Sequence, residues 1–596
     1  MRAKKIPSAR RRFLQALPAA VAGSAAVPAL MGAQDPQPRI AKETLDCATK
    51  VFGLDFSDAE EEAALRGVNR SLESFEQLRA LAVPLDTEPA VTFRPYLPGK
   101  KPRPGATPGR SIRFTPTPAP ARRSSVDDLA FLPVTALAPL VKGRDVTSTE
   151  LTRMYLARLN THGPRLNNVV TLTEELALAQ AAQADKEIRS GQYRGPLHGI
   201  PWGAKDLFAT RGIPTTWGAA PFEKQVFDYD ATVVERLHDA GAILVAKLSL
   251  GALAQGDRWF RGQTKNPWNP EHPQRGGSSG SSAGPGSATA AGLVGFSLGS
   301  ETRGSIISPS AANGVVGLRP TYGRVSRHGA MALSWTMDKV GPMCRSVEDC
   351  ALVFNAIYGP DGRDDTVVDA PFAWNPELPL GKLRIGFIRA EFEPRADAGA
   401  PAGGAAAGGA GAGRGGLSPA EERAQREAQL RLLNDALDVY RKAGATLEPI
   451  DLPGTALAST IAFILSTEAA AAFDDLTRGK DIGDPSLGNW PNTFRTHRFV
   501  PAVEYIRAQR ARTLLMREMD ALMSRLDVFL SPTGSASLGL TNLTGHPAVA
   551  VRAGFHNNAP VMLMLTGRLY DEATLLRVAL AYERATDWHT VRPALE

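Results

Sequence analysis

The chain has 596 residues, of which 43% are hydrophobic and 22% charged, a composition typical of a globular protein with a large core and not of a disordered one. Its three cysteines, Cys47, Cys344 and Cys350, do not have the number or spacing of a disulfide framework or of a metal site. The net charge is +7, but six positive charges lie in the first twelve residues and leave only +1 for the rest, which argues against a nucleic-acid-binding surface.

The first 33 residues have the pattern of a cleavable export signal. A basic start precedes the apolar run FLQALPAAVAGSAAVPAL, which is too interrupted for a membrane span, and small residues follow near MGAQ. The order Arg10-Arg11-Arg12-Phe13-Leu14 resembles the twin-arginine export motif, with Ala9 where Ser or Thr is usual. We expect 1–33 to direct a folded protein to the periplasm or the medium, with no stable membrane span after its removal. A disordered basic tail and an uncleaved anchor are the alternatives.

Two further segments precede the main body of the chain. Residues 34–83 are predicted to form a helical N-terminal extension, with LESFEQLRAL as its clearest amphipathic piece. Residues 84–125 are rich in proline and basic residues and have no sustained hydrophobic period, which predicts an extended linker or a surface strap.

From residue 126 to 596 predicted strands alternate with predicted helices. STELTRMYLARLNTH, EELALAQAAQADKEIRSG and TVVERLHDAGA have helical patterns, whereas GIPWGA and ILVAKL are short apolar runs. Further on, KLRIGFI, a helix from Ser418 and ATLEPIDL predict a β-α-β unit, interrupted by a Gly/Ala-rich insertion near 392–417. This alternation indicates an α/β domain.

A serine-rich stretch, 275–310, holds the first candidate nucleophile. Gly280-Ser281-Ser282-Ala283-Gly284 fits G-x-S-x-G, in which Ser282 would be the nucleophile of an α/β-hydrolase. That elbow needs a buried strand directly before the serine, but the preceding NPWNPEHPQRGG is a Pro- and Gly-rich loop. The context therefore disfavours Ser282 as the nucleophile.

A second interpretation uses the ends of two predicted elements. Ser281 and Ser282 precede a short predicted helix, whose unpaired N–H groups favour a hydroxyl that gives up its proton. Ser305 lies in the turn GSETRGS after the predicted strand VGFSL, where successive N–H groups can point inward, as an oxyanion hole requires.

These segments resemble the amidase signature family. Its Gly/Ser-rich run, its A-A-G helix segment and its G-[TS]-[DE]-x-G-G-S-[IV] turn correspond here to 280–284, 290–292 and 299–306. The A-A-G register selects Ser281-Ser282 over the upstream pair Ser278-Ser279. The family's G-[IV]-P-x-x-x-K-D segment is matched by GIPWGAKD, and TTWG, TKNPWN, GLRPTYGRVS, MDKVGPM and NLTGHPAVAV extend the resemblance from about residue 126 to the C-terminus.

The resemblance implies the amidase signature fold, an α/β fold with a mixed β-sheet core flanked by α-helices, and a Ser-cisSer-Lys triad. Ser305 would attack the carbonyl, Ser281 would relay its proton and Lys205 would be the general base. Ser282 and Gly280 would support them, with a cis peptide bond before Ser281. The oxyanion hole would be formed by the backbone N–H groups of four residues: Thr302, Arg303, Gly304 and Ser305.

Two of these residues carry physical expectations. A free lysine has a pKa of about 10.4, so Lys205 can act as a base near neutral pH only if burial lowers its pKa by several units. We therefore expect Lys205 to be buried. Arg303 stands where the family pattern has glycine; its side chain points outward, crowds the hole or fixes a substrate group, and a positive φ would strain it.

Three other polar residues are expected to have structural roles. His546 has no counterpart in the family's catalytic pattern, and a lone histidine is more often structural. Asp338 is expected to brace a loop. Asp206 directly follows Lys205, and its side chain is expected to face away, because a paired carboxylate would hold the lysine charged.

The predicted function is that of an exported serine amidohydrolase that needs no metal and no cofactor, with a small-molecule or peptide amide as substrate. No nucleic-acid partner is expected, and a homo-oligomer is left open. The alternatives are a glutaminase-type subunit of a tRNA amidotransferase and a non-catalytic amidase-fold binding protein. The export signal counts against the first, and the intact Lys205, Ser281 and Ser305 count against the second.

Overall fold

The computed structural model describes residues 39–54, 56–79, 92–97, 112–115, 125–273, 276–377, 379–394 and 419–595. The chain divides into two units, 1–82 and 83–596. The predicted export signal, most of the Pro/Arg-rich segment, nearly all of the Gly/Ala-rich insertion and Ser418 lie outside the described residues. What the sequence predicts for them stays a prediction.

Within the described residues, the first unit contains two helices, α2 (Lys42–Val51) and α3 (Asp58–Arg79). Asn69 of α3 binds the backbone of Ile40, which lies two residues before the first residue of α2. Its side-chain amide accepts a hydrogen bond from Ile40 N (2.9 Å) and donates one to Ile40 O (3.1 Å).

A mixed sheet forms the centre of the second unit. Within the described residues it has 11 strands in the order β1-β3-β2-β6-β8-β7-β12-β13-β11-β9-β10. β2 is parallel to both β3 and β6, and β9 is parallel to both β10 and β11, whereas the other neighbouring pairs are antiparallel. The strands are β1 (Val169–Leu172), β2 (Pro201–Lys205), β3 (Ile243–Leu248), β6 (Phe296–Glu301), β7 (Val316–Arg319), β8 (Lys339–Cys344), β9 (Ile385–Ile388), β10 (Leu447–Ile450), β11 (Val528–Pro532), β12 (Ala548–His556) and β13 (Ala559–Gly567). Two residue pairs form a separate ribbon, β4 (Arg258–Trp259) and β5 (Gly262–Gln263).

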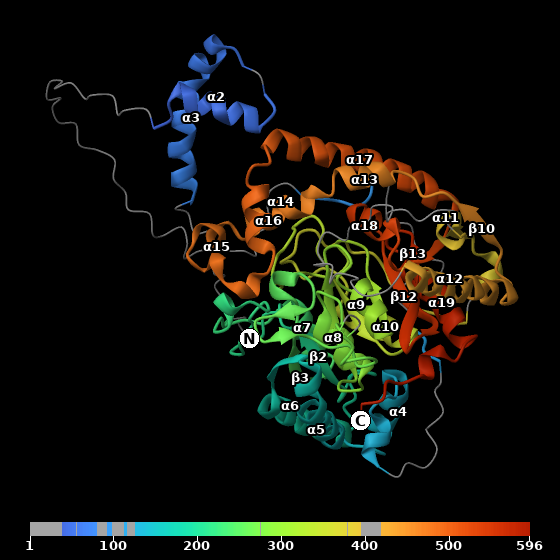
Figure 1. Ribbon diagram of the computed structural model, residues 1–596. Helices are drawn as coiled ribbons and strands as arrows, with labels where there is room; N and C mark the ends of the chain where they lie inside the picture. Colours follow the sequence, from blue (N-terminus) through green and yellow to red (C-terminus); the bar gives the residue numbers. More distant parts are fainter. Residues whose placement is uncertain are drawn as a thin grey trace, which may run out of the picture. The chain divides into compact units, whose positions relative to one another are not determined.

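Helices flank this sheet (Figure 1). The predicted helical segment STELTRMYLARLNTH becomes α5, which starts at a capping box in which Thr147 and Glu150 each accept a hydrogen bond from the other's backbone N–H. The helices are α4 (Val134–Gly143), α5 (Ser148–Leu166), α6 (Glu174–Arg189), α7 (Thr232–Asp239), α8 (Ala283–Ala290), α9 (Ile307–Asn313), α10 (Val347–Ile357), α11 (Arg389–Phe392), α12 (Pro419–Lys442), α13 (Thr455–Thr460), α14 (Phe463–Ala472), α15 (Asp474–Arg478), α16 (Trp490–His497), α17 (Ala502–Arg525), α18 (Ala536–Leu543) and α19 (Glu572–Arg584).

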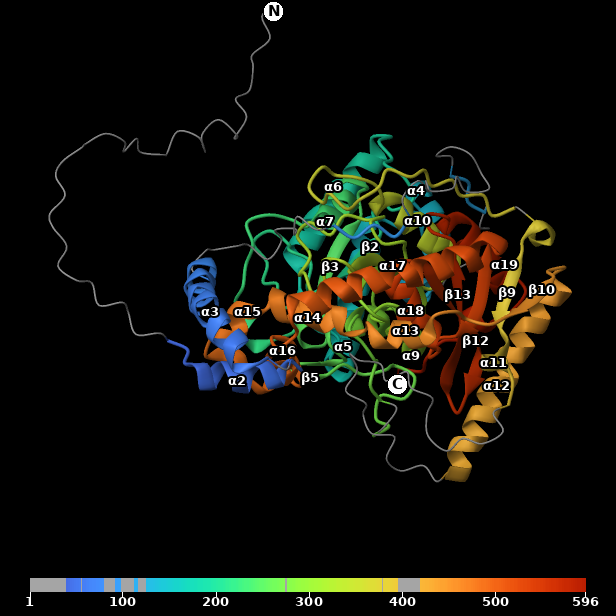
Figure 2. The same cartoon turned by 90° about the horizontal axis from the view of Figure 1, so that it is seen from above.

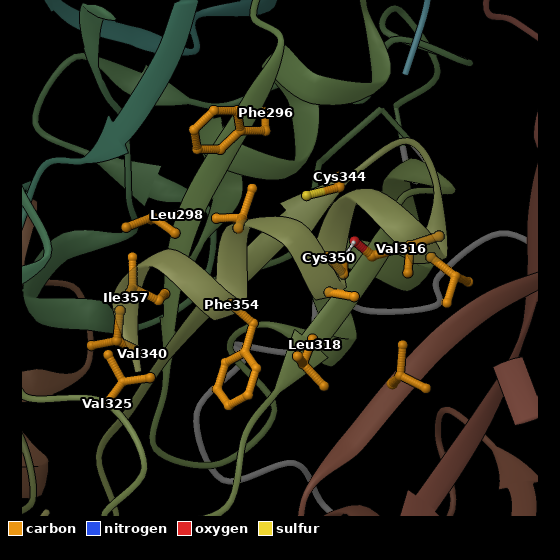
Figure 3. Packing of buried hydrophobic residues seen from close by; sticks show 14 of the residues in the cluster. Phe296, Leu298, Val316, Leu318, Val325, Val340, Cys344, Cys350, Phe354 and Ile357 are labelled. Carbon is orange, nitrogen blue, oxygen red and sulfur yellow. Dashed lines mark hydrogen bonds between the residues drawn. The ribbon is translucent and has the colours of Figure 1, made fainter. Parts of the chain in front are cut away.

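The alternation of side chains along β6 separates the two faces of the sheet. Phe296 and Leu298 point into the main hydrophobic core with α10, whose Phe354 and Ile357 are buried beside them (Figure 3). Ser297 points to the opposite face, where its hydroxyl donates to Pro285 O of α8 (3.1 Å). Because successive strand residues face opposite sides, α8 and α10 cover opposite faces of the sheet.

A second core lies under the helices that follow β10. Among the described residues, the helical stretch Thr455–Ala472 has a mean hydropathy of 1.4 and is long and apolar enough to cross a membrane by length and composition alone. It is broken into α13 and α14, which run beside α17 (Figure 2). Ile461 and Ile464 at the break are buried in the core formed with Leu515 of α17, an environment typical of core helices in a globular protein.

Two short pieces of the predicted linker, 92–97 and 112–115, pack on the second unit, and together we call them the strap. In the first piece, the Phe93 ring lies edge-on to Tyr322, with 5.1 Å between ring centroids. The Arg512 guanidinium lies 3.5 Å from the centre of the same ring.

The second piece of the strap is held through its backbone. Arg113 N donates to Trp374 O (3.0 Å), and Thr115 N donates to the Glu348 carboxylate (2.6 Å). Both pieces of the strap are therefore fixed to later parts of the second unit.

Candidate active site

The fold brings three distant segments to one edge of the sheet. β2 ends at Lys205, and its parallel neighbour β6 ends at Glu301. Because parallel strands end on the same side of a sheet, Lys205 and the loop after Glu301 meet there. α8 lies on the Ser297 face of β6 and begins at the same edge. The lysine segment, the Ser281-Ser282 turn and the Ser305 turn are therefore neighbours, as the resemblance implies.

The amine of Lys205 is fully buried among oxygen atoms. Its Nζ lies 2.8 Å from Ser281 Oγ and 3.1 Å from Ser282 Oγ. It also lies 2.9 Å from Ser300 Oγ and 3.3 Å from Ser300 O. Lys205 forms no ion pair with any carboxylate in the described part of the chain. A positive charge at this position is thus shielded from bulk solvent and has no carboxylate partner among the described residues.

Burial lowers the pKa of Lys205 to about 7, against the opposing influence of the Asp338 and Glu301 carboxylates. About half of the molecules then carry a neutral amine at pH 7. A neutral amine has a lone pair, so it can accept the Ser281 proton across the 2.8 Å contact. The expected burial of Lys205 is confirmed, and its pKa moves in the expected direction.

Ser281 follows a cis peptide bond, Gly280–Ser281, as the resemblance implies. Gly280 leaves no room for a side chain, because a Cβ atom there would lie 1.7 Å from Gly256 O. Ser282 is the residue before α8 and binds Ser300 twice: its hydroxyl accepts from Ser300 N and donates to Ser300 O, both at 3.2 Å. Ser282 is fully buried and no strand leads into it, which does not fit a nucleophile elbow.

A buried glutamate anchors the loop between β6 and α9. Glu301 Oε2 accepts hydrogen bonds from Ile306 N (2.8 Å) and Ile307 N (2.9 Å), so the loop folds back over this carboxylate. Glu301 Oε1 receives Arg319 Nη1 (2.9 Å) and Asn542 Nδ2 (2.7 Å). Burial alone would raise the pKa of Glu301, but the Arg319 charge and these donors outweigh it and hold the pKa below its usual value.

The loop presents free backbone donors around Ser305. The N–H groups of Arg303, Gly304 and Ser305 find no acceptor among the protein atoms that the structure describes. Ser305 is half-buried, and its carbonyl accepts from Ser282 N (3.1 Å), which ties it to the Ser281-Ser282 turn. The Ser305 hydroxyl forms no hydrogen bond to Ser281 within the described residues. Lys205 and Ser281 are therefore in contact, whereas the hydroxyls of Ser281 and Ser305 are not hydrogen-bonded to each other in this structure.

Known proteins resemble this chain over most of its length. The family model described as Amidase matches residues 150–402. A glutamyl-tRNA(Gln) amidotransferase subunit from Chloroflexus aggregans is 36% identical over an alignment of 516 residues, gaps included, that covers 78% of this chain and 99% of the relative. The corresponding protein of Methylococcus capsulatus is 34% identical over an alignment of 508 residues that covers 77% of this chain and 98% of the relative. The chain belongs to the amidase signature family.

Solved structures of amidase signature enzymes agree with this assignment. Peptide amidase from Stenotrophomonas maltophilia is 29% identical, with a TM-score of 0.66 over 79% of this chain and 100% of that chain. A bacterial aryl acylamidase of the amidase signature family is 21% identical with a TM-score of 0.66 over 78% of this chain and 99% of that chain, which shows the fold. The predicted family and the predicted mixed sheet with flanking helices are confirmed, and the chain is an amidase-type hydrolase of amide C–N bonds.

Arg303 fits the backbone of this amidase without strain. The left-handed residue of the loop is Gly304, with φ of 98°, and Arg303 is not among the residues of positive φ. A Cβ atom at Gly304 would lie 3.0 Å from Ser308 Oγ and 3.2 Å from Leu538 Cδ2. The glycine that this turn requires is therefore present at 304, and position 303 tolerates a side chain.

The two aspartates behave as expected. Asp206 turns away from Lys205: its carboxylate accepts from Thr216 Oγ1 (2.5 Å) and lies 3.1 Å from Lys247 Nζ. Asp338 braces a loop by accepting from Leu333 N (2.8 Å) and Ser334 N (2.9 Å). Burial raises the pKa of Asp338, although these donors oppose the shift.

His546 is structural in this amidase. Its ring is buried, its Nδ1 lies 2.9 Å from Thr544 Oγ1, and its carbonyl accepts from Arg319 Nη2 (2.8 Å). Burial, reinforced by the Arg319 charge, lowers the pKa of His546 to about 3. The ring is therefore neutral near pH 7.

Sequence reasoning missed three supports of the site. Ser300 contacts Lys205, Glu301 anchors the loop, and Asp338 also accepts a hydrogen bond from Thr302 Oγ1 (2.6 Å). Ser300 and Glu301 lie inside the turn motif GSETRGS. The sequence signal for these two supports was therefore a polar residue and an acid within a Gly/Ser-rich turn. Nothing in the spacing of Asp338 indicated its contact with Thr302.

Proposed function

We propose that the protein hydrolyses a carboxylic amide through an acyl-enzyme on Ser305, with Ser281 as proton relay and Lys205 as general base. The observation that carries the proposal is the buried Lys205 amine, with its pKa lowered to about 7, 2.8 Å from the Ser281 hydroxyl. An amine in this state is a competent base near neutral pH, which an exposed lysine is not.

Acylation moves one proton along the triad. Ser305 Oγ attacks the amide carbonyl while its proton passes to Ser281 Oγ, and the Ser281 proton passes to Lys205 Nζ. The free N–H groups of the 302–305 turn stabilise the negative oxygen of the tetrahedral intermediate. When the C–N bond breaks, the proton on Lys205 returns through Ser281 to the leaving nitrogen, which departs as ammonia or an amine.

Deacylation repeats these steps with water as the nucleophile. Water adds to the Ser305 ester and gives its proton to the relay, the second tetrahedral intermediate collapses, and Ser305 Oγ takes a proton back. The products are a carboxylic acid and the regenerated enzyme. The open Ser281–Ser305 contact closes when substrate binds, because catalytic hydrogen bonds tighten in the Michaelis complex.

The location and mode of action are part of the proposal. We infer an exported enzyme that acts alone, on the basis of the twin-arginine-like start at 1–33. The second candidate is a component of an amidotransferase, favoured by the 36% identity to a protein of that name. The two differ in a measurable way, because a stand-alone amidase turns over free amides without any partner.

The test is to treat the purified protein with a fluorophosphonate and locate the adduct by peptide mass spectrometry. We expect the adduct on Ser305, its loss in Ser305→Ala, and its retention in Ser282→Ala. Lys205→Ala should slow labelling by about 10²–10⁴-fold, the typical contribution of general-base catalysis. A panel of free amides then separates the stand-alone amidase from the amidotransferase component.

An adduct on Ser282 would overturn the assignment of the nucleophile. Labelling of Ser305 that proceeds at the wild-type rate in Lys205→Ala would overturn the role of the lysine. If Ser305 labels and no free amide is hydrolysed, the amidotransferase function is favoured.

A further inference from the structure

Arg303 is an unpaired cation beside the proposed nucleophile. It lies two residues before Ser305 and is half-buried. Its guanidinium packs over Gly539 of α18, where a Cβ atom would lie 3.3 Å from both Nε and Nη2. Because position 539 has no side chain, the Arg303 guanidinium can lie directly against α18.

Arg303 differs from three buried arginines of this unit. They are each paired with a carboxylate at 2.9–3.1 Å: Arg319 with Glu301, Arg324 with Glu572, and Arg327 with Asp364. Within the residues that the structure describes, Arg303 forms no ion pair and donates no hydrogen bond. A guanidinium carries five N–H donors, so all of its hydrogen-bonding capacity is available to a ligand.

The surroundings of Arg303 favour an anion. Burial lowers the pKa of Arg303, and no charged neighbour contributes to that shift, so no acid compensates the charge. The guanidinium nevertheless stays protonated near neutral pH. The free backbone donors of the same turn add to the positive potential. A half-buried charge without a counter-ion costs free energy unless a ligand supplies the counter-ion.

We propose that the Arg303 guanidinium binds a carboxylate carried by the amide substrate close to the bond that is cleaved. The inference rests on the proposed function and names its substrate class, an anionic amide. The Cα atoms of Arg303 and Ser305 are two residues apart and so at most about 7 Å from each other. The guanidinium lies over Gly539, whose neighbour Leu538 borders Gly304 of the same turn. A carboxylate bound there would belong to the same substrate molecule as the carbonyl that Ser305 attacks. Planar pairing of guanidinium and carboxylate is bidentate, which would also orient the amide.

The carboxylate has two positions available on such a substrate, and the experiment separates them. Succinamic acid carries it on the acyl side, with butanamide as its neutral counterpart. N-Acetyl-β-alanine carries it on the leaving amine, with N-propylacetamide as its neutral counterpart. Each compound is used to protect Ser305 against a fluorophosphonate, and the concentration for half-protection is measured in the wild type and in Arg303→Gln.

We expect one carboxylate compound to protect about 10- to 100-fold better than its neutral counterpart, as a charge-assisted hydrogen bond predicts. Arg303→Gln should remove this preference, and Arg303→Lys should keep part of it. The preference is the ratio of the half-protecting concentrations of the neutral and the carboxylate compound. If the substitution at 303 also disturbs the backbone donors of the turn, all compounds are affected alike and this ratio does not change. Arg507→Gln, which removes an exposed arginine of α17, is the matched control and should keep the full preference.

The outcomes separate this inference from the proposed function. Labelling of Ser305 with equal protection by charged and neutral compounds overturns the inference and leaves the proposed function standing. A preference that survives in Arg303→Gln assigns the anion to another group and also overturns it. If Ser305 is not labelled at all, both the inference and the proposed function are contradicted.

Discussion

The amine of Lys205 has four oxygen contacts and no acid partner among the described residues, and this combination makes its charge state sensitive to pH near neutrality. Two carboxylates, Asp338 and Glu301, raise its pKa from a distance, but burial is the larger influence and brings the pKa to about 7. The same side chain on the protein surface would be charged at every physiological pH.

The pH profile of the enzyme follows from this pKa. Because the proposed base is the neutral amine, kcat/KM for an amide is expected to fall about tenfold per pH unit below pH 7 and to level off above it. Since His546 has its pKa lowered to about 3, it does not titrate in this range. A profile of kcat/KM or of Ser305 labelling between pH 5 and 9 measures the expectation, and a flat profile would contradict the role of Lys205.

At the residue scale, the motifs predicted which residues meet but not all of their contacts. Lys205, Ser281 and Ser282 come together because the matched segments place them at a strand end or a helix start. The turn motif marks Ser300 as a polar residue near the site, but its contact with Lys205 depends on which face of β6 the side chain occupies. Asp338 reaches Thr302 across 36 residues, and no local pattern encodes such a contact.

At the element scale, the turn between β6 and α9 owes its shape to Glu301. Two backbone N–H groups and two side chains converge on one carboxylate, and the free donors belong to residues between Glu301 and Ile306. The sequence predicted β6, α8 and the turn from their apolar and glycine patterns. It did not predict that an acid inside the turn would be its anchor.

Replacing this anchor should cost activity. Glu301→Gln leaves the Arg319 charge without its carboxylate and puts an amide donor against other donors, so the turn shifts and the apparent Tm falls. We expect kcat to drop by about 10²–10³-fold, with a smaller change in KM, because the turn donors act on the transition state.

The matched control breaks a buried ion pair of the same kind elsewhere. Glu572→Gln removes the carboxylate that binds Arg324 Nε at 3.1 Å. It should lower the apparent Tm and leave kcat near the wild-type value. An equal loss of kcat in both variants would mean that Glu301 acts through general stability alone.

At the scale of the whole molecule, the strap joins the N-terminal part of the second unit to its later elements. The relatives align over 78% of this chain, and the resemblance begins near residue 126, so the strap precedes the part predicted from the family. Its contacts were not predictable, because single aromatic residues such as Phe93 leave no hydrophobic period in a proline-rich segment.

Phe93→Ala tests how much the strap contributes to stability. The ring contacts Tyr322 and Arg512, and losing these contacts should cost about 1–2 kcal/mol, which lowers the apparent Tm of so large a unit by about 1–3 °C. Thermal unfolding measures the change. Phe499→Ala is the control, since that ring is 62% exposed and its removal should leave the Tm unchanged. Equal Tm values for the two variants would show that the strap adds no stability.

The contacts of Glu301 also determine when, during synthesis of the chain, the turn between β6 and α9 can reach its final shape. Its partners Asn542 and Arg319, and the His546 carbonyl that holds Arg319, span the chain from 319 to 546. A ribosome that has delivered about 500 residues has already produced Lys205, Ser281 and Ser305, but not the segment that completes the turn around the proposed nucleophile. We therefore expect hydrolytic competence only when nearly the whole polypeptide has been made, and we expect a prematurely terminated product to carry all three side chains of the proposed triad and to be inert.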